Sequence, residues 1–331
     1  MTTGGKAKRH DPVPATDPDR VVPPGPSPID LHTHTTRSDG LVPPADLVQA
    51  AFAAGVRLLA LTDHDNLAGY REVVAARAVP VGLNLLAGVE INAIVPRDLG
   101  LWEGELHILG FGMDPDDEAF EATLAAQRDR RRERFERMVV RLRELGMPID
   151  VQIAERTTVG PHRSSGGDPA AAREANSDAL GRPTVARAMI DAGYVESVDE
   201  AFSTYLSYGK PAYVPRSGLD PMGAILAIRD AGGLPVLAHF SEAPTRVPVI
   251  RELIDAGLGG LEVYYRSFDA PTVFAVGEVA TALDLVATGG SDYHGDFGPY
   301  TESHAMLWVP PEIGPPLEAA IDAVSRPRAR P

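Results

Sequence analysis

Short apolar runs of strand length alternate with segments of helical pattern over most of this 331-residue chain. The alternation holds in residues 29–112 and returns in residues 217–331, with seven or eight strand–helix units in all. Parallel strands need long crossover connections, usually helices, so this order predicts a parallel α/β fold. Because polar residues follow nearly every expected strand, we favour a barrel over a doubly wound sheet. No glycine-rich dinucleotide or phosphate-binding loop follows the first strand.

The boundaries of these elements follow from apolar periodicity and from glycine and proline positions. The first expected strand ends at Leu31. The others span residues 56–61, 83–95, 105–112, 234–238, 260–264, 284–288 and 305–309. Helices are expected to start after Gly181 and Ser197 and to span residues 44–54, 66–78, 114–145, 219–231, 246–256, 271–282 and 316–325.

Three parts of the chain differ in character. Arginine-rich helical sequence interrupts the alternation over residues 113–216, and residues 152–180 within it have the Gly, Ser and Asp content of a loop. We therefore predict a barrel formed by residues 29–112 and 217–331, with 113–216 as a helical insertion that caps the substrate. Residues 1–28 hold many prolines and no apolar periodicity, so we expect a disordered leader.

Composition limits the function classes. The net charge of −15 argues against binding long nucleic acid or an anionic membrane, but allows a small phosphorylated substrate in a local basic pocket. The chain has no cysteine, which excludes disulfides and thiolate metal ligands. It also lacks an apolar run of membrane-spanning length and an apolar signal core, so we expect a cytoplasmic protein. Nothing in it predicts an oligomeric state.

Nine ionisable side chains are assigned to the carboxyl ends of the expected strands, and in a barrel these ends converge on one mouth. They are His32, His34, Asp39, His64, Glu90, His107, His239, Asp292 and His294. Each alone is compatible with a hydrogen-bonded core histidine or a surface carboxylate. Together, six imidazoles and three carboxylates would perturb one another's pKa values severely unless they bound metal.

The spacing at the first strand supports this metal hypothesis. His32 and His34 are two residues apart and would point to the same side of a strand, with Asp39 in the turn that follows. Nine ligands exceed the four that zinc typically takes, so we expect two or three ions. A mixed histidine and carboxylate set suits Mn²⁺, Fe²⁺ or Zn²⁺, and the residues do not decide among them, although Mn²⁺ is our first candidate.

The motifs around these residues resemble those of the PHP family, named for its polymerase and histidinol phosphatase domains. The matching motifs are His-Thr-His at 32–34, Ser-Asp-Gly at 38–40, Thr-Asp-His-Asp at 62–65, Gly-Val-Glu at 88–90, His107, Ala-His at 238–239 and Ser-Asp-Tyr-His at 291–294. The resemblance implies a distorted seven-stranded (β/α) barrel with a three-metal cluster. Carried over by position, His32, His34, Glu90 and Asp292 would hold one ion, Glu90, His107 and His239 a second, and Asp39, His64 and His294 a third.

The order of the motifs also resembles the stand-alone phosphoesterases of this family. That branch includes nucleoside 3′,5′-bisphosphate phosphatases with RNA 5′-end exonuclease activity. It also includes cyclic phosphodiesterases that act on 5-phosphoribosyl 1,2-cyclic phosphate. The resemblance implies hydrolysis of a small phosphorylated metabolite or nucleotide by a hydroxide that bridges two metal ions. Two alternatives of other classes are an amidohydrolase, which cleaves C–N bonds, and a non-catalytic metal-binding module.

Arginines are the expected contacts for substrate phosphate. Arg182 is the first candidate, because it precedes a helix start, where anions are favoured, and because the matching arginine of the branch is expected to hold phosphate. Arg266, Arg134 and Arg131 are further candidates, although the last two could equally lie on a solvated helix face. Thr184 and Phe268 stand where relatives that act on nucleotides tend to have histidine, which leaves the substrate open.

Three other polar residues receive supporting roles. We expect Asp63 to orient an imidazole of the metal site, and Asp65 to cap the helix that follows it. His304 is expected at the surface.

Overall fold

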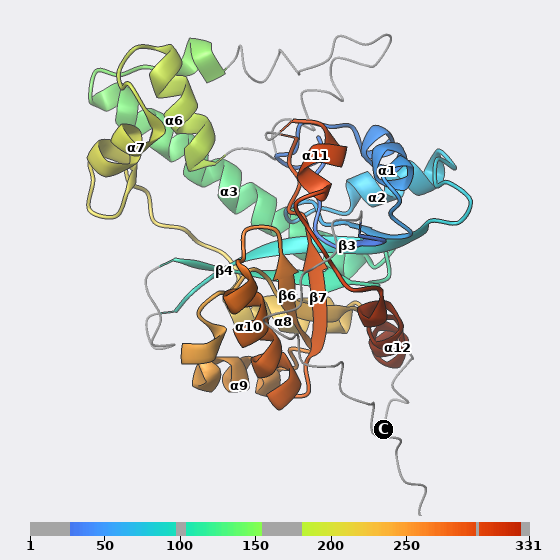
Figure 1. Cartoon of the computed structure of the whole chain (residues 1–331). Helices are drawn as coiled ribbons and strands as arrows, with labels where there is room; N and C mark the ends of the chain where they lie inside the picture. Colours follow the sequence, from blue (N-terminus) through green and yellow to red (C-terminus); the bar gives the residue numbers. More distant parts are fainter. Residues whose placement is uncertain (1–26, 97–103, 154–180, 296–297, 326–331) are drawn as a thin grey trace, which may run out of the picture.

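The computed structural model of this chain describes residues 27–96, 104–153, 181–295 and 298–325 (Figure 1). Its centre is a seven-stranded sheet whose strands follow one another in chain order. The strands are β1 (Ile29–Asp30), β2 (Leu58–Leu61), β3 (Asn84–Ile94), β4 (Glu105–Phe111), β5 (Leu234–Leu237), β6 (Gly260–Tyr265) and β7 (Val286–Gly290). The expected barrel fold is confirmed.

The sheet curls so that its first and last strands meet. The Leu31 amide donates to the Gly289 carbonyl at 3.1 Å, and the Asp292 amide donates to the His32 carbonyl at 2.7 Å. Further along, the His34 amide reaches the Tyr293 carbonyl at 2.8 Å. The segment after β1 therefore pairs with the segment after β7 and nearly closes the barrel.

One strand runs against the others, which corrects the expectation of an all-parallel barrel. β4 pairs antiparallel with both β3 and β5, whereas the other neighbouring pairs are parallel. Only residues 95–104 join β3 to β4. A parallel crossover needs a dozen or more residues, so this short connection can only form an antiparallel pair.

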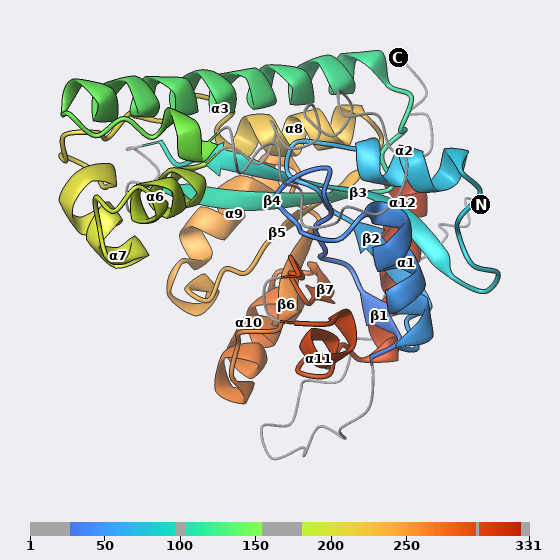
Figure 2. The same cartoon turned by 90° about the horizontal axis from the view of Figure 1, so that it is seen from above.

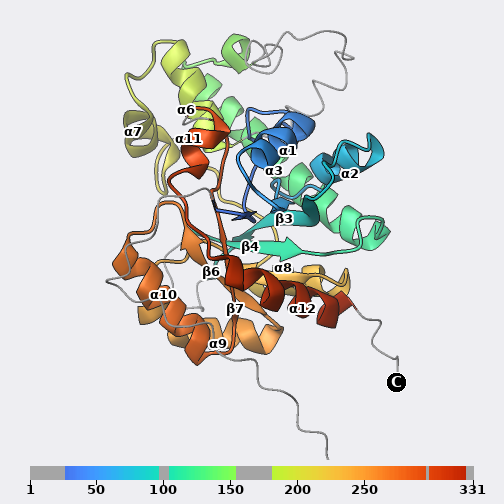
Figure 3. The ribbon, with the colours of Figure 1, turned by 45° about the vertical axis from the view of Figure 1, so that its right-hand side comes forward.

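Helices cover the outside of the sheet. They are α1 (Pro44–Ala53), α2 (Ala68–Ala75), α3 (Glu118–Glu144), α8 (Pro221–Asp230), α9 (Val247–Ala256), α10 (Ala270–Ala282), α11 (Tyr300–His304) and α12 (Gly314–Ser325). Two further helices, α6 (Arg182–Asp191) and α7 (Val198–Ala201), lie away from the sheet, where α6 packs against α3 and α7 packs against α6. A π-helical turn, Phe202–Leu206, continues α7, and two 3₁₀ turns lie at Ala243–Thr245 and Pro311–Ile313. Helices α10 and α12 pack along β7, as Figure 3 shows.

The element boundaries agree with the expected ones except near the chain's end. The strand expected at residues 305–309 is wrong, because α11 occupies Tyr300–His304 and turn and coil follow it. The loop-like residues 152–180 and the leader 1–28 fall largely outside the described residues. Ser27, the first residue that is described, is buried, and its hydroxyl donates to the carbonyls of Ile29 and Val309. No described helix is both long enough and apolar enough to cross a membrane.

Helix α3 links two apolar clusters. Phe120 and Leu124, near its start, pack in the barrel core, while Phe135 and Met138 pack in a separate cluster built by residues 135–214. Figure 2 shows α3 extending from the barrel to α6 and α7. One continuous helix therefore contributes side chains to both clusters and connects the inserted helices to the barrel.

A buried polar network fixes the junction between β1 and the end of the chain. Asp30 is fully buried and accepts hydrogen bonds from the hydroxyls of Ser291 at 2.6 Å and Tyr300 at 2.7 Å. His304 lies beside it, with its Nδ1 3.5 Å from the Asp30 carboxylate and its Nε2 2.8 Å from the Ser27 carbonyl. His304 is only 1% exposed, so the expected surface position is wrong. This network fastens the first strand that leads into the site.

Replacing His304 with glutamine is expected to make stability less dependent on pH. Burial opposes the charge on His304, but the Asp30 carboxylate outweighs it and raises the pKa of His304 above its ordinary value. The imidazolium therefore stabilises the fold fully below the unfolded pKa of about 6.5, and this contribution disappears as pH rises through the folded pKa. In urea unfolding with chelator present, the wild type should exceed His304→Gln by more at pH 6 than at pH 9.

The matched control is Tyr300→Phe, which removes a hydrogen bond to the same carboxylate but no group that titrates near neutral pH. Its loss of unfolding free energy should be similar at both pH values. A difference for His304→Gln that stays constant or grows with pH would show that His304 is neutral in the folded protein.

Candidate metal centre

The segment after β1 places two imidazoles side by side at the barrel mouth. His32 and His34 are both 0% exposed. Thr33, between them, forms a parallel β-bridge with Tyr293, which follows β7. The Nε2 atoms of the two histidines lie 3.4 and 3.1 Å from Oε2 of Glu90. They lie 3.4 and 3.3 Å from Oδ1 of Asp292. The alternation of side chains along an extended segment thus directs both imidazoles to the same two carboxylates.

Glu90 is the central carboxylate of the cluster. It lies within β3 and is 1% exposed. Its Oε2 faces His32, His34 and, at 3.1 Å, Nδ1 of His64. Its Oε1 lies 2.6 Å from Nδ1 of His107 and 3.3 Å from Nε2 of His239. One side chain is therefore shared between two sets of imidazoles.

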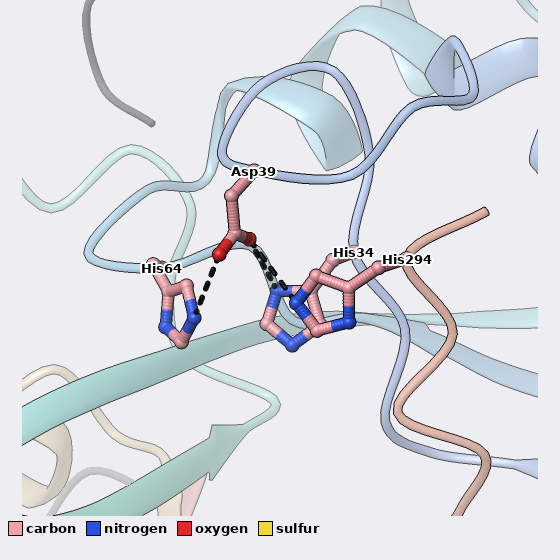
Figure 4. A group of neighbouring side chains, drawn as sticks. All are labelled: His34, Asp39, His64 and His294. Carbon is pink, nitrogen blue, oxygen red and sulfur yellow. Dashed lines mark ion pairs between the residues drawn. The ribbon is translucent and has the colours of Figure 1, made fainter. Parts of the chain in front are cut away.

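A second carboxylate, that of Asp39, lies close to three imidazoles, as Figure 4 shows. Asp39 follows His34 in a turn, and its oxygens lie 3.2 Å from Nε2 of His294 and 3.6 Å from Nε2 of His64. Nδ1 of His34 lies 3.7 Å from the same carboxylate. The structure thus adds His34 to the set of Asp39, His64 and His294 that the family resemblance implied.

His107 reaches the mouth for a reason that the sequence did not reveal. It was placed at the carboxyl end of its strand, but it is the third residue of β4 and lies near the amino end. Because β4 is antiparallel to its neighbours, its amino end lies beside the carboxyl ends of the parallel strands. The structure places His107 beside Glu90 and His239, but at the opposite end of its strand from the one expected.

The backbone is strained around the cluster. Among the described residues, five non-glycine residues have positive φ, and Asp65, His239 and Asp292 are three of them, with values of 48°, 34° and 49°. Left-handed conformations of such residues cost free energy and concentrate at functional sites. Two of these three side chains belong to the predicted ligand set.

The charges of the cluster require compensation. Burial opposes the charge on His34, but Asp292 and Glu90 outweigh it and raise its pKa to about 10. Burial lowers the pKa of His64 to about 3, although Asp39 and Glu90 act in the opposite direction. Burial likewise opposes ionisation of Glu90, but the surrounding imidazoles hold its pKa well below the ordinary range. Three ionised carboxylates at one mouth need protons or metal ions as partners.

The donor atoms fit metal ions. Among the described residues, Nε2 of His32, Nε2 of His34 and Nδ1 of His64 are buried and make no hydrogen bond, although Oε2 of Glu90 lies 3.4, 3.1 and 3.1 Å from them. Buried polar atoms without partners are costly unless they bind something. Three groups have ligand atoms close enough to hold an ion: His34, Asp39, His64 and His294; His32, His34 and Glu90; and Glu90, His107 and His239. The nitrogen and oxygen donors suit Mn²⁺, Fe²⁺ or Zn²⁺.

Two residues around the cluster were missed. Glu262 on β6 is fully buried and lies 3.0 Å from Nδ1 of His32. The hydroxyl of Tyr265 donates to Oδ2 of Asp292 at 2.9 Å. An acidic residue inside the apolar run from Leu261 to Val263 was the available signal for Glu262, because an ionisable group in a buried strand needs a partner.

The two aspartates that flank His64 have other partners than we expected. Asp63 accepts hydrogen bonds from Thr35 and from the Ser38 hydroxyl, so it holds the turn that carries Asp39 and does not bind an imidazole. Asp65 forms an ion pair with Arg131 and does not cap α2. Arg131 is thereby occupied in holding α3 against the barrel.

The other predicted phosphate contacts lie between the barrel and the inserted helices. Arg134 is 8% exposed and donates through Nε to the Val214 carbonyl at 2.9 Å. Within the described residues, Nη2 of Arg134 and Nε of Arg182 are buried without a hydrogen-bond partner. Burial and the neighbouring charge of Arg182 lower the pKa of Arg134 to about 10. Arg266 directly follows β6 and donates to the Asp292 carbonyl at 3.4 Å.

A cavity of about 350 Å³ adjoins Arg182. Arg182, Arg216, Tyr208 and Tyr213 line it. Arg216 also forms an ion pair with Glu105, whose carboxylate lies 3.4 Å from Nε2 of His107. The cavity therefore lies next to the cluster and offers cationic and aromatic surfaces.

Known proteins resemble this chain over most of its length. The PHP domain profile matches residues 30–149. A 3′,5′-nucleoside bisphosphate phosphatase from Chromobacterium violaceum is 33% identical, over 80% of this chain and 87% of that protein. A 5′-3′ exoribonuclease from Haemophilus influenzae is 32% identical, over 80% and 89%. A phosphoribosyl 1,2-cyclic phosphate 1,2-diphosphodiesterase from Eggerthella lenta is 30% identical, over 81% and 95%.

Solved structures give the same result. A metal-free, sulfate-bound structure from Chromobacterium violaceum, described as an amidohydrolase, has a TM-score of 0.70 and 30% identity, and covers 90% of this chain and 97% of its own. A structure from Bifidobacterium adolescentis, described as a metal-dependent phosphoesterase, has a TM-score of 0.62 and 32% identity, with coverage of 82% and 88%. Together with the histidine and carboxylate cluster, these similarities show that the chain belongs to the PHP family of metal-dependent phosphoesterases.

Proposed function

We propose that this protein hydrolyses a small substrate carrying two phosphate groups, with a nucleoside 3′,5′-bisphosphate as the first candidate. The observation that supports it best is the position of two incompletely bonded arginines, Arg134 and Arg182. Arg134 lines a pocket with Glu105, which approaches His107 of the cluster, and Arg182 lines the cavity with Arg216, which pairs with Glu105. The cluster would act on one phosphate while the arginines bind the other. The relatives that are named as acting on a nucleoside bisphosphate and on RNA ends support a nucleotide.

The proposed cofactors are two or three divalent ions, with Mn²⁺ favoured, held by the three groups of ligand atoms described above. Asp292, whose Oδ1 faces both His32 and His34, would complete the group of His32, His34 and Glu90. Divalent ions held there would neutralise phosphoryl oxygens and supply hydroxide from water near neutral pH. Tyr265 would fix the orientation of Asp292 through its hydrogen bond.

The protein's own side chains would select and orient the substrate. Arg182 and Arg134 would bind the second phosphate by charge-assisted hydrogen bonds, which are stronger than neutral ones. The rings of Tyr208 and Tyr213, whose centroids are 5.5 Å apart in the cavity wall, offer a surface on which a nucleobase could stack. Residues 113–216 are proposed as the cap over the barrel residues 29–112 and 217–331.

A cyclic phosphodiester of phosphoribose is the second candidate. The Eggerthella lenta relative is named for that substrate, and Arg266 offers a further cation beside Asp292. An amidohydrolase activity is less well supported, because the arginines around the site favour an anionic substrate over an amide. Long RNA is disfavoured by the net charge of −15, although trimming of short 5′ ends remains part of the proposal. A cytoplasmic location is also proposed.

The test compares phosphate release by the Mn²⁺-loaded protein from a nucleoside 3′,5′-bisphosphate and from 5-phosphoribosyl 1,2-cyclic phosphate. The proposal predicts a higher kcat/KM for the bisphosphate. A preference for the cyclic compound would identify the second candidate as the substrate and would make Arg266 its main cationic contact. Turnover of neither compound with metals bound would overturn both substrates.

A further inference from the structure

Glu262 occupies a position that joins two of the metal groups. Its Oε1 lies 3.0 Å from Nδ1 of His32, and its Oε2 accepts the backbone N–H of His239 at 2.7 Å. His32 belongs to the group with His34 and Glu90, whereas His239 belongs to the group with Glu90 and His107. Glu262 itself belongs to none of these groups and is fully buried.

We propose that Glu262 is a positioning residue that prepares both groups for metal, by setting the tautomer of His32 and holding the backbone of His239. When Nδ1 of His32 donates its proton to Glu262, Nε2 is left with a free lone pair. That Nε2 faces Glu90 and Asp292, where an ion would bind. Partners of this kind orient metal-binding imidazoles and increase their basicity.

The contact with His239 acts on the backbone. His239 has φ of +34°, a conformation that is strained for a residue with a side chain. The hydrogen bond from its N–H to Glu262 compensates part of this strain and aims the imidazole at Glu90, which its Nε2 approaches to 3.3 Å. One carboxylate therefore supports a ligand by its side chain in one group and by its main chain in the other.

Replacing Glu262 with glutamine tests these roles separately from packing, because glutamine has nearly the same size and shape. The two groups that contact Glu262 are both donors in the metal-ready state, and glutamine offers one acceptor oxygen where glutamate offers two. Its NH₂ must then face either the His239 N–H or Nδ1 of His32. In the second case the His32 proton moves to Nε2, where it blocks the ligand atom. We expect Glu262→Gln to weaken metal binding by about 10- to 100-fold.

The experiment measures Zn²⁺ and Mn²⁺ affinity by chelator competition for the full chain without substrate. The matched control is Leu261→Val on the same strand, which loses buried apolar contacts on the opposite face of the sheet. Melting of the chelator-treated proteins reports the purely structural effect. Glu262→Gln should lose metal affinity beyond any loss of melting temperature, whereas the control should lose melting temperature alone.

A spectroscopic signature gives a second readout. In ¹⁵N-histidine spectra of the Zn²⁺-loaded wild type, His32 should carry its proton on Nδ1, and this signal should be lost or moved in Glu262→Gln. Unchanged metal affinity, or an equal loss in Leu261→Val, would overturn the inference. The inference rests on the proposed metal cluster and not on the substrate. A wild type that binds metal but cleaves no phosphate ester would contradict the proposed function alone, and one that binds no divalent metal would overturn both.

Discussion

Replacing Glu90 with glutamine is expected to lower kcat for phosphate-ester hydrolysis by about 10³-fold, equivalent to about 4 kcal/mol in the barrier. Glu90 is the carboxylate that two metal groups share, and its oxygens face imidazoles on both sides. Glutamine keeps the shape of the side chain but removes its charge and replaces one ligand oxygen with a nitrogen that cannot bind metal. Metal content should fall together with kcat, which is measured by phosphate release at saturating substrate.

The control for this substitution is Glu252→Gln, an exposed glutamate on α9 that should leave kcat within about twofold of the wild type. A Glu90→Gln protein that retains wild-type turnover with full metal content would contradict the central place given to this carboxylate. Far-UV circular dichroism of the same sample distinguishes loss of turnover caused by unfolding from loss caused by the missing carboxylate.

Replacing Arg182 with glutamine should reduce kcat/KM for a nucleoside 3′,5′-bisphosphate by about 10- to 100-fold, because it removes a charge-assisted contact worth about 1.5–3 kcal/mol. Arg182 lines the cavity beside the cluster, and its guanidinium is held 5.2 Å above the ring of Phe202. For p-nitrophenyl phosphate, which has no second phosphate, the same substitution should change kcat/KM by less than about threefold. The measurement is the ratio of the two kcat/KM values.

Arg187→Gln is the matched control, because Arg187 lies on the same helix, α6, and is exposed. It removes the same charge from the inserted helices without touching the cavity. An equal loss for both substrates in Arg182→Gln would mean that the arginine supports the cluster and does not recognise a second phosphate.

The cluster was predictable from sequence because its chemistry is concentrated in few motifs. His32 and His34 are two residues apart in an extended segment, and Asp292 and His294 follow the last strand with the same spacing. The structure brings all nine predicted side chains to one mouth. Their assignment to individual ions remains a proposal, since the geometry shows which atoms meet and His34 approaches both Glu90 and Asp39.

What the sequence could not give depends on contacts between distant segments. The antiparallel direction of β4 depends on the short connection from β3, and a parallel strand was expected from the sequence. His107 was therefore expected at the carboxyl end of its strand, whereas it lies near the amino end. Asp30 and His304 lie far apart along the chain, so no local pattern could show that they form a buried pair. The ion pair between Arg131 and Asp65 could not be predicted either, because it joins α3 to a segment far away along the chain.

The most direct test of this account is phosphate release before and after metal removal. Protein that has been dialysed against a chelator should release no phosphate from a nucleoside 3′,5′-bisphosphate. Addition of Mn²⁺ should restore turnover as the ion groups fill, with two or three ions per chain by elemental analysis. Full turnover by the metal-free protein, or three bound ions without turnover of any phosphate ester, would contradict the assignment of this cluster as a metal-dependent phosphoesterase site.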